Sequence, residues 1–369
     1  MRAAPGQVVA GRYRVTDRPD DEAGVPAVDV HGGARVRLFG LELPELLVPG
    51  HPSGEPAPSY APRLTARVAQ VAAAAGTHPR LLRGLAAGPE GEVLWVAEEA
   101  VPGVPLELLA AAGPLPPYRV AEIGADLAAA LRSVHEDGLT HGNLTLRTVL
   151  VCEDGAAMLG GLLLGAAEEE LCAALGGEVP RRVYETRALM LGPLAERWAI
   201  DAGAPADTWA LGVLLYRLLT GHGPYPETDL PTLLAAVRDG HHHPADGCGP
   251  LRPLVERLLR PGAAARPDAA AVQRELRVLL ASAPEPGLAG PAEPPLPVAR
   301  PAAGPLVPRQ RGRRAARAAA GAVADRQGPD RQGAQRPPRI PPRLLGPLLL
   351  GGVLLLLVAG LAGIVAVAG

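Results

Sequence analysis

The chain has 369 residues and a formal net charge of −2, and all 36 basic residues are arginine because the sequence contains no lysine. This composition excludes any mechanism that needs a catalytic lysine. The three cysteines, Cys152, Cys172 and Cys248, have no paired spacing, which argues against a disulfide framework and a structural zinc site and fits a reducing cytosol.

The first hundred residues favour a small sheet around one helix. Four short runs are typical of strands, and one stretch has apolar residues at helical spacing. The predicted strands are Tyr13–Val15, Ala27–Val30, Arg35–Phe39 and Val93–Glu98, and the predicted helix is Leu64–Ala75.

The pattern after residue 100 is mostly helical, apart from a strand expected around Ala156–Leu159. An acidic run, Glu168–Glu170, is interpreted as the exposed start of a short helix. A sheet-rich lobe followed by a helical lobe is an α+β arrangement. The predicted helices are Arg119–His135, Asp207–Leu219, Leu230–Arg238, Pro250–Leu259 and Asp268–Leu280.

Residues 282–343 differ in composition from the rest of the chain. They are rich in Pro, Ala, Gly and Gln, and their 11 arginines against 4 acids give a net charge of +7. Residues 1–281 hold the other 25 arginines and 34 acids, and so carry −9. We expect a disordered linker here. A nucleic-acid role is not favoured, because the run lacks interleaved aromatic residues and the attached domain is acidic.

Residues 344–368 form an uncharged stretch rich in Leu, Val and Gly. At about 1.5 Å per residue, a helix of this length exceeds a hydrocarbon core of about 30 Å. We therefore predict a single transmembrane helix that contacts membrane lipid, with only Gly369 after it, and hence a tail-anchored protein. No secretory signal opens the chain, and the arginine-rich flank favours a cytoplasmic position for residues 1–281.

Three ordered blocks resemble one family. The segment Val96–Leu150, which ends in HEDGLTHGNLTLRTVL, resembles the hinge and catalytic loop of eukaryotic-like bacterial Ser/Thr protein kinases. Ala206–Tyr225 resembles the central helix of the large lobe, and Ala263–Leu276 resembles its last helical junction. The resemblance implies a two-lobed kinase-like fold over residues 1–281, with the lobe boundary near residue 100.

The resemblance also shows where the small lobe should bind nucleotide. Phosphoryl transfer needs glycine-cradled phosphates and a lysine paired with a glutamate. Here the expected glycine-rich interval reads TDRPDDEAGVPAV, with one glycine and four acids, and Phe39 stands at the position of the lysine. Ala61–Ala75, which should hold the glutamate, contains no acid. Glu98 falls at or next to the residue at the back of the adenine pocket, or else in the hinge.

The catalytic loop departs from the family in the same way. Its HGNLTLRTVL replaces H-R-D-L-K-P-x-N-x-L, so the proton-accepting aspartate becomes Asn143, whose amide is no base. Thr145 replaces the loop lysine, Thr148 replaces the metal-binding asparagine, and Gly160 stands where the magnesium-binding D-F-G triplet should begin.

Several positions that the family uses to hold the large lobe together are kept. His141 packs the catalytic loop, and Asp207 resembles the buried aspartate that accepts hydrogen bonds from the loop's backbone. Arg266 resembles the arginine that pairs with an A-P-E glutamate, for which only Pro193–Glu196 is a candidate. Three adjacent histidines, His241–His243, are interpreted as an exposed turn, because neighbouring side chains cannot all reach one ion.

The sequence thus favours a membrane-anchored pseudokinase: a regulatory or scaffolding module with no catalytic residue, no cofactor and protein partners at the membrane. Cell-envelope regulation is the process that the resemblance suggests. The alternative is a divergent Ser/Thr protein kinase that binds ATP and Mg²⁺ and phosphorylates proteins. A nucleotide sensor without turnover is a third reading, against which Phe39 and Gly160 argue.

Overall fold

A computed structural model describes residues 3–16, 24–44, 59–176 and 203–283. The linker 282–343, apart from its first two residues, the predicted span 344–368 and the candidate Pro193–Glu196 lie outside these ranges. Within them, no helix combines the length and the apolar character needed to cross a membrane.

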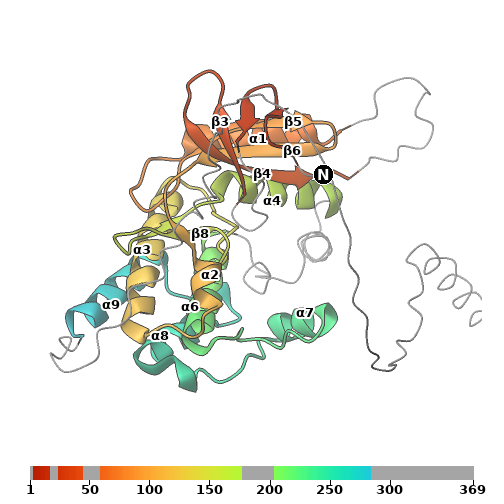
Figure 1. The fold of residues 1–369 in the computed structure, drawn as a ribbon. Coiled ribbons are helices and arrows are strands. Elements are labelled where there is room, and N and C mark those ends of the chain that lie inside the picture. The colour runs from red at the N-terminus through yellow and green to blue at the C-terminus, as the bar shows by residue number, and fades with distance from the viewer. Residues whose placement is uncertain (1–2, 17–23, 45–58, 177–202, 284–369) are drawn as a thin grey trace, which may run out of the picture. The chain divides into compact units, whose positions relative to one another are not determined.

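The small lobe is an antiparallel sheet with one helix, as predicted (Figure 1). The helix, α1 (Ala61–Ala74), begins three residues before the predicted Leu64, because Pro62 suits a first turn that needs no backbone N–H from it. The strands, in the spatial order β1-β2-β3-β4-β6-β5, are β1 (Val8–Val9), β2 (Tyr13–Val15), β3 (Val25–Asp29), β4 (Arg35–Glu42), β5 (Gly84–Glu90) and β6 (Val93–Glu99).

Both faces of the sheet are packed, because side chains alternate between the faces along a strand and each face contributes buried residues to a core. On the outer face Val36 and Leu38 join a core built from β1, β2 and β6. On the inner face Leu41, Leu94 and Val96 join the core that continues through α1 into the large lobe. Arg37 and Phe39 share this inner face, since they alternate with the outer residues of β4.

The large lobe is helical, as predicted, around the almost entirely buried α6 (Ala204–Thr220). α3 (Pro117–Glu136) and α8 (Arg252–Leu258) pack on α6, and α9 (Ala269–Ala281) packs on α3. The remaining elements are β7 (Val104–Pro105), α2 (Leu106–Ala110), β8 (Val149–Val151), β9 (Ala157–Leu159), α4 (Leu162–Gly176), α7 (Leu230–Asp239) and the 3₁₀ turns η2 (Asp246–Leu251) and η3 (Ala263–Ala265).

Three differences from the prediction have local causes. The predicted helix Pro250–Leu259 is shorter in the structure, because Pro250 and Leu251 belong to η2 and α8 begins at Arg252. Gly249, which has a φ of 52°, interrupts the helical backbone just before Pro250. Strand β5 was not predicted, because its sequence GLAAGPE has little strand propensity and is held by pairing with β6. The acidic run was placed wrongly: Glu168–Glu170 lies inside α4, which begins six residues earlier, and Glu168 is buried.

Several contacts join the two lobes behind the hinge. Leu82 N–H donates to Leu159 O at 2.7 Å and Leu159 N–H donates to Arg80 O at 2.8 Å, which ties the segment before β5 to β9. Arg80 also pairs with Asp126 of α3 at 2.9 Å. Helix α4 in turn packs on α1, β4 and β5.

The approach of α4 to β5 depends on Gly84. A Cβ at this position would lie 2.3 Å from Leu163 Cγ, so the side chain of Leu163 occupies the space that any larger residue would need. We expect Gly84→Ala to destabilise the protein by about 1–3 kcal/mol through overpacking. In Leu163→Ala, which itself costs about 2–5 kcal/mol, the same change should cost much less. Chemical denaturation of the four variants measures this coupling, and additive costs would show that the contact is not made.

Candidate functional site

The catalytic-loop segment is held by one buried carboxylate. Asp207, in the first turn of α6 and 1% exposed, accepts hydrogen bonds from the backbone N–H groups of His141 and Gly142, both at 2.8 Å. His135 Nε2 lies 2.8 Å from the same carboxylate. Bonds to an ionised acceptor are stronger than neutral ones, so Asp207 fixes the backbone of the loop.

Asn143, at the position of the family's catalytic aspartate, is fully buried. Its side-chain Nδ2 donates to Gly161 O at 3.2 Å, and its backbone N–H donates to Nδ1 of His141 at 3.2 Å. The amide therefore ties the catalytic loop to the Gly160–Gly161 pair and is used structurally.

The two threonines of the loop close its turn. Thr148 Oγ1 accepts from Thr145 N–H at 3.0 Å and lies 2.7 Å from Asn143 O, to which it donates. The carbonyl of Thr148 accepts from Gly160 N–H at 2.8 Å. Both residues thus satisfy the loop's own backbone groups where a lysine and a metal ligand were expected.

Glu98 meets the Gly160–Gly161 pair from the small lobe. It lies at the end of β6, is 5% exposed, and accepts from Gly161 N–H at 2.6 Å. A Cβ on Gly160 would lie only 2.5 Å from Glu98 Oε1, so this position has no room for an aspartate while Glu98 stays in place. The structure therefore places Glu98 at the back of the cleft and not in the hinge.

Burial dominates the electrostatics of Glu98. Desolvation, the largest cause, raises the pKa of its carboxyl, and the nearby Glu99 adds to the rise, whereas the bond from Gly161 and the charge of Arg37 oppose it; the net result is a pKa of about 7. Arg37 pairs directly opposite Glu98 across β4 and β6. The inner face of the sheet thus carries two ionisable side chains where an apolar base would need an apolar surface.

Helix α4 fills the space that follows the glycine pair. A Cβ on Gly165 would lie 2.5 Å from His141 O, so the first turn of α4 lies directly against the catalytic loop. Farther along, Glu170 pairs with Arg63 of α1. The chain's own helix therefore lies between α1 and the catalytic loop.

The expected phosphate and magnesium sites do not fit these ligands. The ring of Phe39 covers Gly24, where a Cβ would lie 2.8 Å from Phe39 Cε1, and α1 carries no acid. Thr148 and Gly160 offer Mg²⁺ no carboxylate, and the Glu98 carboxylate is bound to Gly161. In the described ranges, no group of three or more His, Cys, Asp or Glu side chains is arranged to hold a metal ion.

Arg266 lies in the large lobe, and among the described residues it donates to three backbone carbonyls. Its guanidinium donates to Pro205 O at 3.0 Å, to Arg260 O at 2.7 Å and to Pro261 O at 2.8 Å. It thus ties the segment before α9 to the start of α6.

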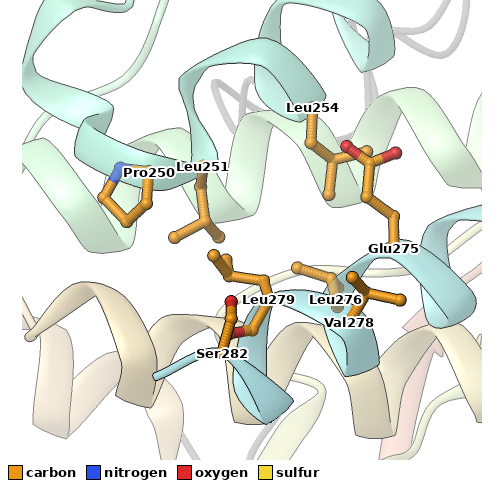
Figure 2. Close-up of a pocket in the computed structure, with 8 residues that line it drawn as sticks. All are labelled: Pro250, Leu251, Leu254, Glu275, Leu276, Val278, Leu279 and Ser282. Carbon is orange, nitrogen blue, oxygen red and sulfur yellow. The ribbon is translucent and has the colours of Figure 1, made fainter. Parts of the chain in front are cut away.

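Two hollows lie away from the catalytic loop. One, of about 620 Å³, runs along the end of α1, the segment before β5 and the first residues of α4. The other, of about 230 Å³, lies between η2, α8 and α9 (Figure 2). Figure 2 shows that its lining is mostly aliphatic, and its one acid, Glu275, pairs with Arg257, so it offers no acid–base chemistry.

The three histidines face different partners. The ring of His242 packs on Tyr225 with ring centroids 6.2 Å apart, whereas the ring of His243 packs on His222. His241 and His243 are exposed. The structure therefore agrees with a turn.

The raised pKa of Glu98 predicts a pH dependence of stability. The folded protein binds a proton that the unfolded chain releases between about pH 4.5 and 7, so stability falls as pH rises through this window, by on the order of 3 kcal/mol. We expect Glu98→Gln to remove this loss, so that its free energy of unfolding gains on the wild type as pH rises. The exposed Glu92→Gln is the control. Parallel wild-type and Glu98→Gln curves from pH 4.5 to 8 would contradict the assignment.

Comparison with known proteins identifies the relatives of this chain. Residues 65–276 match the profile of the family described as protein tyrosine and serine/threonine kinase. The chain is 31% identical to the serine/threonine-protein kinase AfsK of Streptomyces coelicolor over 194 residues, which is 52% of this chain and 23% of AfsK.

Two further relatives are serine/threonine-protein kinases that also match only part of this chain. Identity to the serine/threonine-protein kinase PkaA of S. coelicolor is 30% over 205 residues, covering 55% of this chain and 37% of PkaA. Identity to PknL of Mycobacterium tuberculosis is 30% over 141 residues, covering 37% and 33%. The chain thus spans between about a quarter and two fifths of these relatives. With its two-lobed fold and its match over residues 65–276, the chain belongs to the protein tyrosine and serine/threonine kinase family.

Proposed function

We propose that this chain is a pseudokinase that acts as a regulatory or scaffolding module and transfers no phosphoryl group. The observation that carries the proposal is the position of Glu98 beside Gly160 and Gly161, because Glu98, held by its bond from Gly161, occupies the space that a metal-binding aspartate would need. Phosphoryl transfer depends on metal ions that neutralise the developing charge.

Two further features of the cleft support the proposal. The side-chain amide of Asn143 donates to Gly161 O and is not a base that could accept the proton of a substrate hydroxyl. Phe39 stands at the position of the phosphate-binding lysine, and the sequence contains no lysine that could replace it. A divergent enzyme would have to replace each of these groups, any one of which typically contributes a factor of about 10² to 10⁴ in rate.

The place of action that we propose is the cytoplasmic face of a membrane. The uncharged residues 344–368 would form the anchor, and the arginine-rich linker would face the cytoplasm. Such an anchor would confine the domain to encounters with protein partners at the membrane, and cell-envelope regulation is the process that we propose.

An active kinase is the second candidate, favoured by the names of the relatives, which are serine/threonine-protein kinases. On that reading α4 and Glu98 would have to leave the cleft before ATP and Mg²⁺ could enter. The two candidates differ in whether any condition yields phosphoryl transfer.

A phosphotransfer assay tests the proposal. We expect the full-length chain, incubated with γ-labelled ATP and Mg²⁺ or Mn²⁺, to label neither itself nor a general acceptor protein. The kinase domain of AfsK, assayed in parallel, provides the positive control. Labelling that persists after repurification and is lost on removal of the metal would refute the pseudokinase assignment.

The packing around Gly160 gives a second prediction. Gly160→Asp, which restores the family's metal ligand, should lower the free energy of unfolding by at least about 3 kcal/mol, because it buries a second carboxylate against Glu98. Glu98→Ala in the same chain should recover much of this loss. Gly32→Asp is the matched control, since no atom lies within 4 Å of a Cβ there. If Gly160→Asp is as mild as the control, Glu98 does not block the site.

A further inference from the structure

Two arginines share the inner face of the small-lobe sheet. Arg14 on β2 pairs with Val28 on β3, and Val28 pairs with Arg35 on β4. Directly opposed residues in adjacent strands point to the same face, so the two side chains flank Val28, about 10 Å apart at the backbone.

The burial pattern shows which face this is. Tyr13, Val15 and Val36 are buried in the outer core, so their neighbours Arg14 and Arg35 point the other way. This is the face that carries Arg37 and, farther along, Leu41, which joins the core shared with the large lobe. Arg14 and Arg35 therefore lie on the side of the sheet that is turned toward the large lobe.

These two arginines differ from Arg37 in their surroundings. Arg37 is half-buried and faces Glu98, whereas Arg14 and Arg35 are exposed. Within the described ranges, neither guanidinium of the exposed pair forms an ion pair or a hydrogen bond. The charged ends of both side chains are therefore open to a ligand.

The arrangement suits a phosphate monoester. Two guanidinium forks can converge on one phosphate, whose three oxygens and charge near −2 at pH 7 satisfy both, whereas one carboxylate satisfies a single fork. The short side chain of Val28 lies between them as an apolar floor.

The position of the pair favours a peptide over a membrane. A flat bilayer cannot reach a surface that is turned toward the other lobe. An extended peptide can enter along the sheet.

We propose that Arg14 and Arg35 bind the phosphorylated serine or threonine of a partner protein. The site would make the small lobe a reader of phosphorylation. This proposal rests on the proposed function in one respect, because it takes the cleft side of the sheet to be available for a partner in place of nucleotide.

Binding of a labelled peptide to the full-length chain tests the proposal. The probes are a phosphothreonine flanked by alanines, its unphosphorylated twin, inorganic phosphate, and vesicles containing phosphatidylserine. We expect the phosphopeptide alone to bind well, and Arg14→Ala with Arg35→Ala to weaken it at least tenfold while leaving the thermal midpoint unchanged or raised. Arg274→Ala with Arg277→Ala, two exposed arginines of α9, is the control of equal charge and should bind as the wild type does.

Each contrary outcome is informative. Equal binding of the twin, undiminished binding by the Arg14 and Arg35 variant, or binding of vesicles alone would overturn the proposal. Phosphopeptide binding is measured without ATP, so its failure is separate from that of the pseudokinase assignment, which depends on labelling by γ-labelled ATP.

Discussion

The hydrogen bond from Gly161 to Glu98 is the contact on which the rest of the cleft depends. It joins the last residues of β6 to the turn before α4, and it holds Glu98 Oε1 in the space that a side chain at position 160 would occupy. Once the turn is held there, Asn143 reaches the carbonyl of Gly161 and Thr148 reaches the N–H of Gly160. Asn143, Thr148 and Gly160, where the chain departs from the family's pattern, therefore belong to one hydrogen-bonded unit with Glu98 and Gly161.

The architecture of the large lobe survives beside this altered cleft. Asp207 holds the catalytic-loop backbone and Arg266 holds the carbonyls near the start of α6, without contributing to phosphoryl transfer. Fold and chemistry separate because they use different atoms: the fold needs backbone donors and carbonyls satisfied, whereas the reaction needs side-chain carboxylates and a cation in the cleft.

Much of the fold could be predicted from the sequence, because it rests on periodicity. The strand Tyr13–Val15 and the helices around Asp207 and Leu230 match the apolar spacing closely. Strand β5 could not, since GLAAGPE is a strand only through its pairing with β6. The acidic run Glu168–Glu170 was wrongly predicted to be exposed, because charged residues are usually at the surface, whereas Glu168 is buried in α4.

From the sequence, the candidate site could be predicted only through the catalytic groups of the family that it lacks. The absence of lysine and the replacements at Asn143 and Gly160 are visible in the sequence, but the bond that makes Glu98 and the glycines one unit joins residues 63 positions apart. An acid at the back of the pocket together with a glycine at the metal position was the available signal. Neither residue alone indicates that the other fills its space.

The contacts behind the hinge have a mechanical consequence. Glu98 to Gly161, Leu82 to Leu159 and Arg80 to Asp126 span the two lobes at separate points. Contacts of this kind oppose a change in the angle between the lobes. A partner that recognises both lobes together would therefore lose little conformational entropy in binding them, which is the advantage of a preorganised surface.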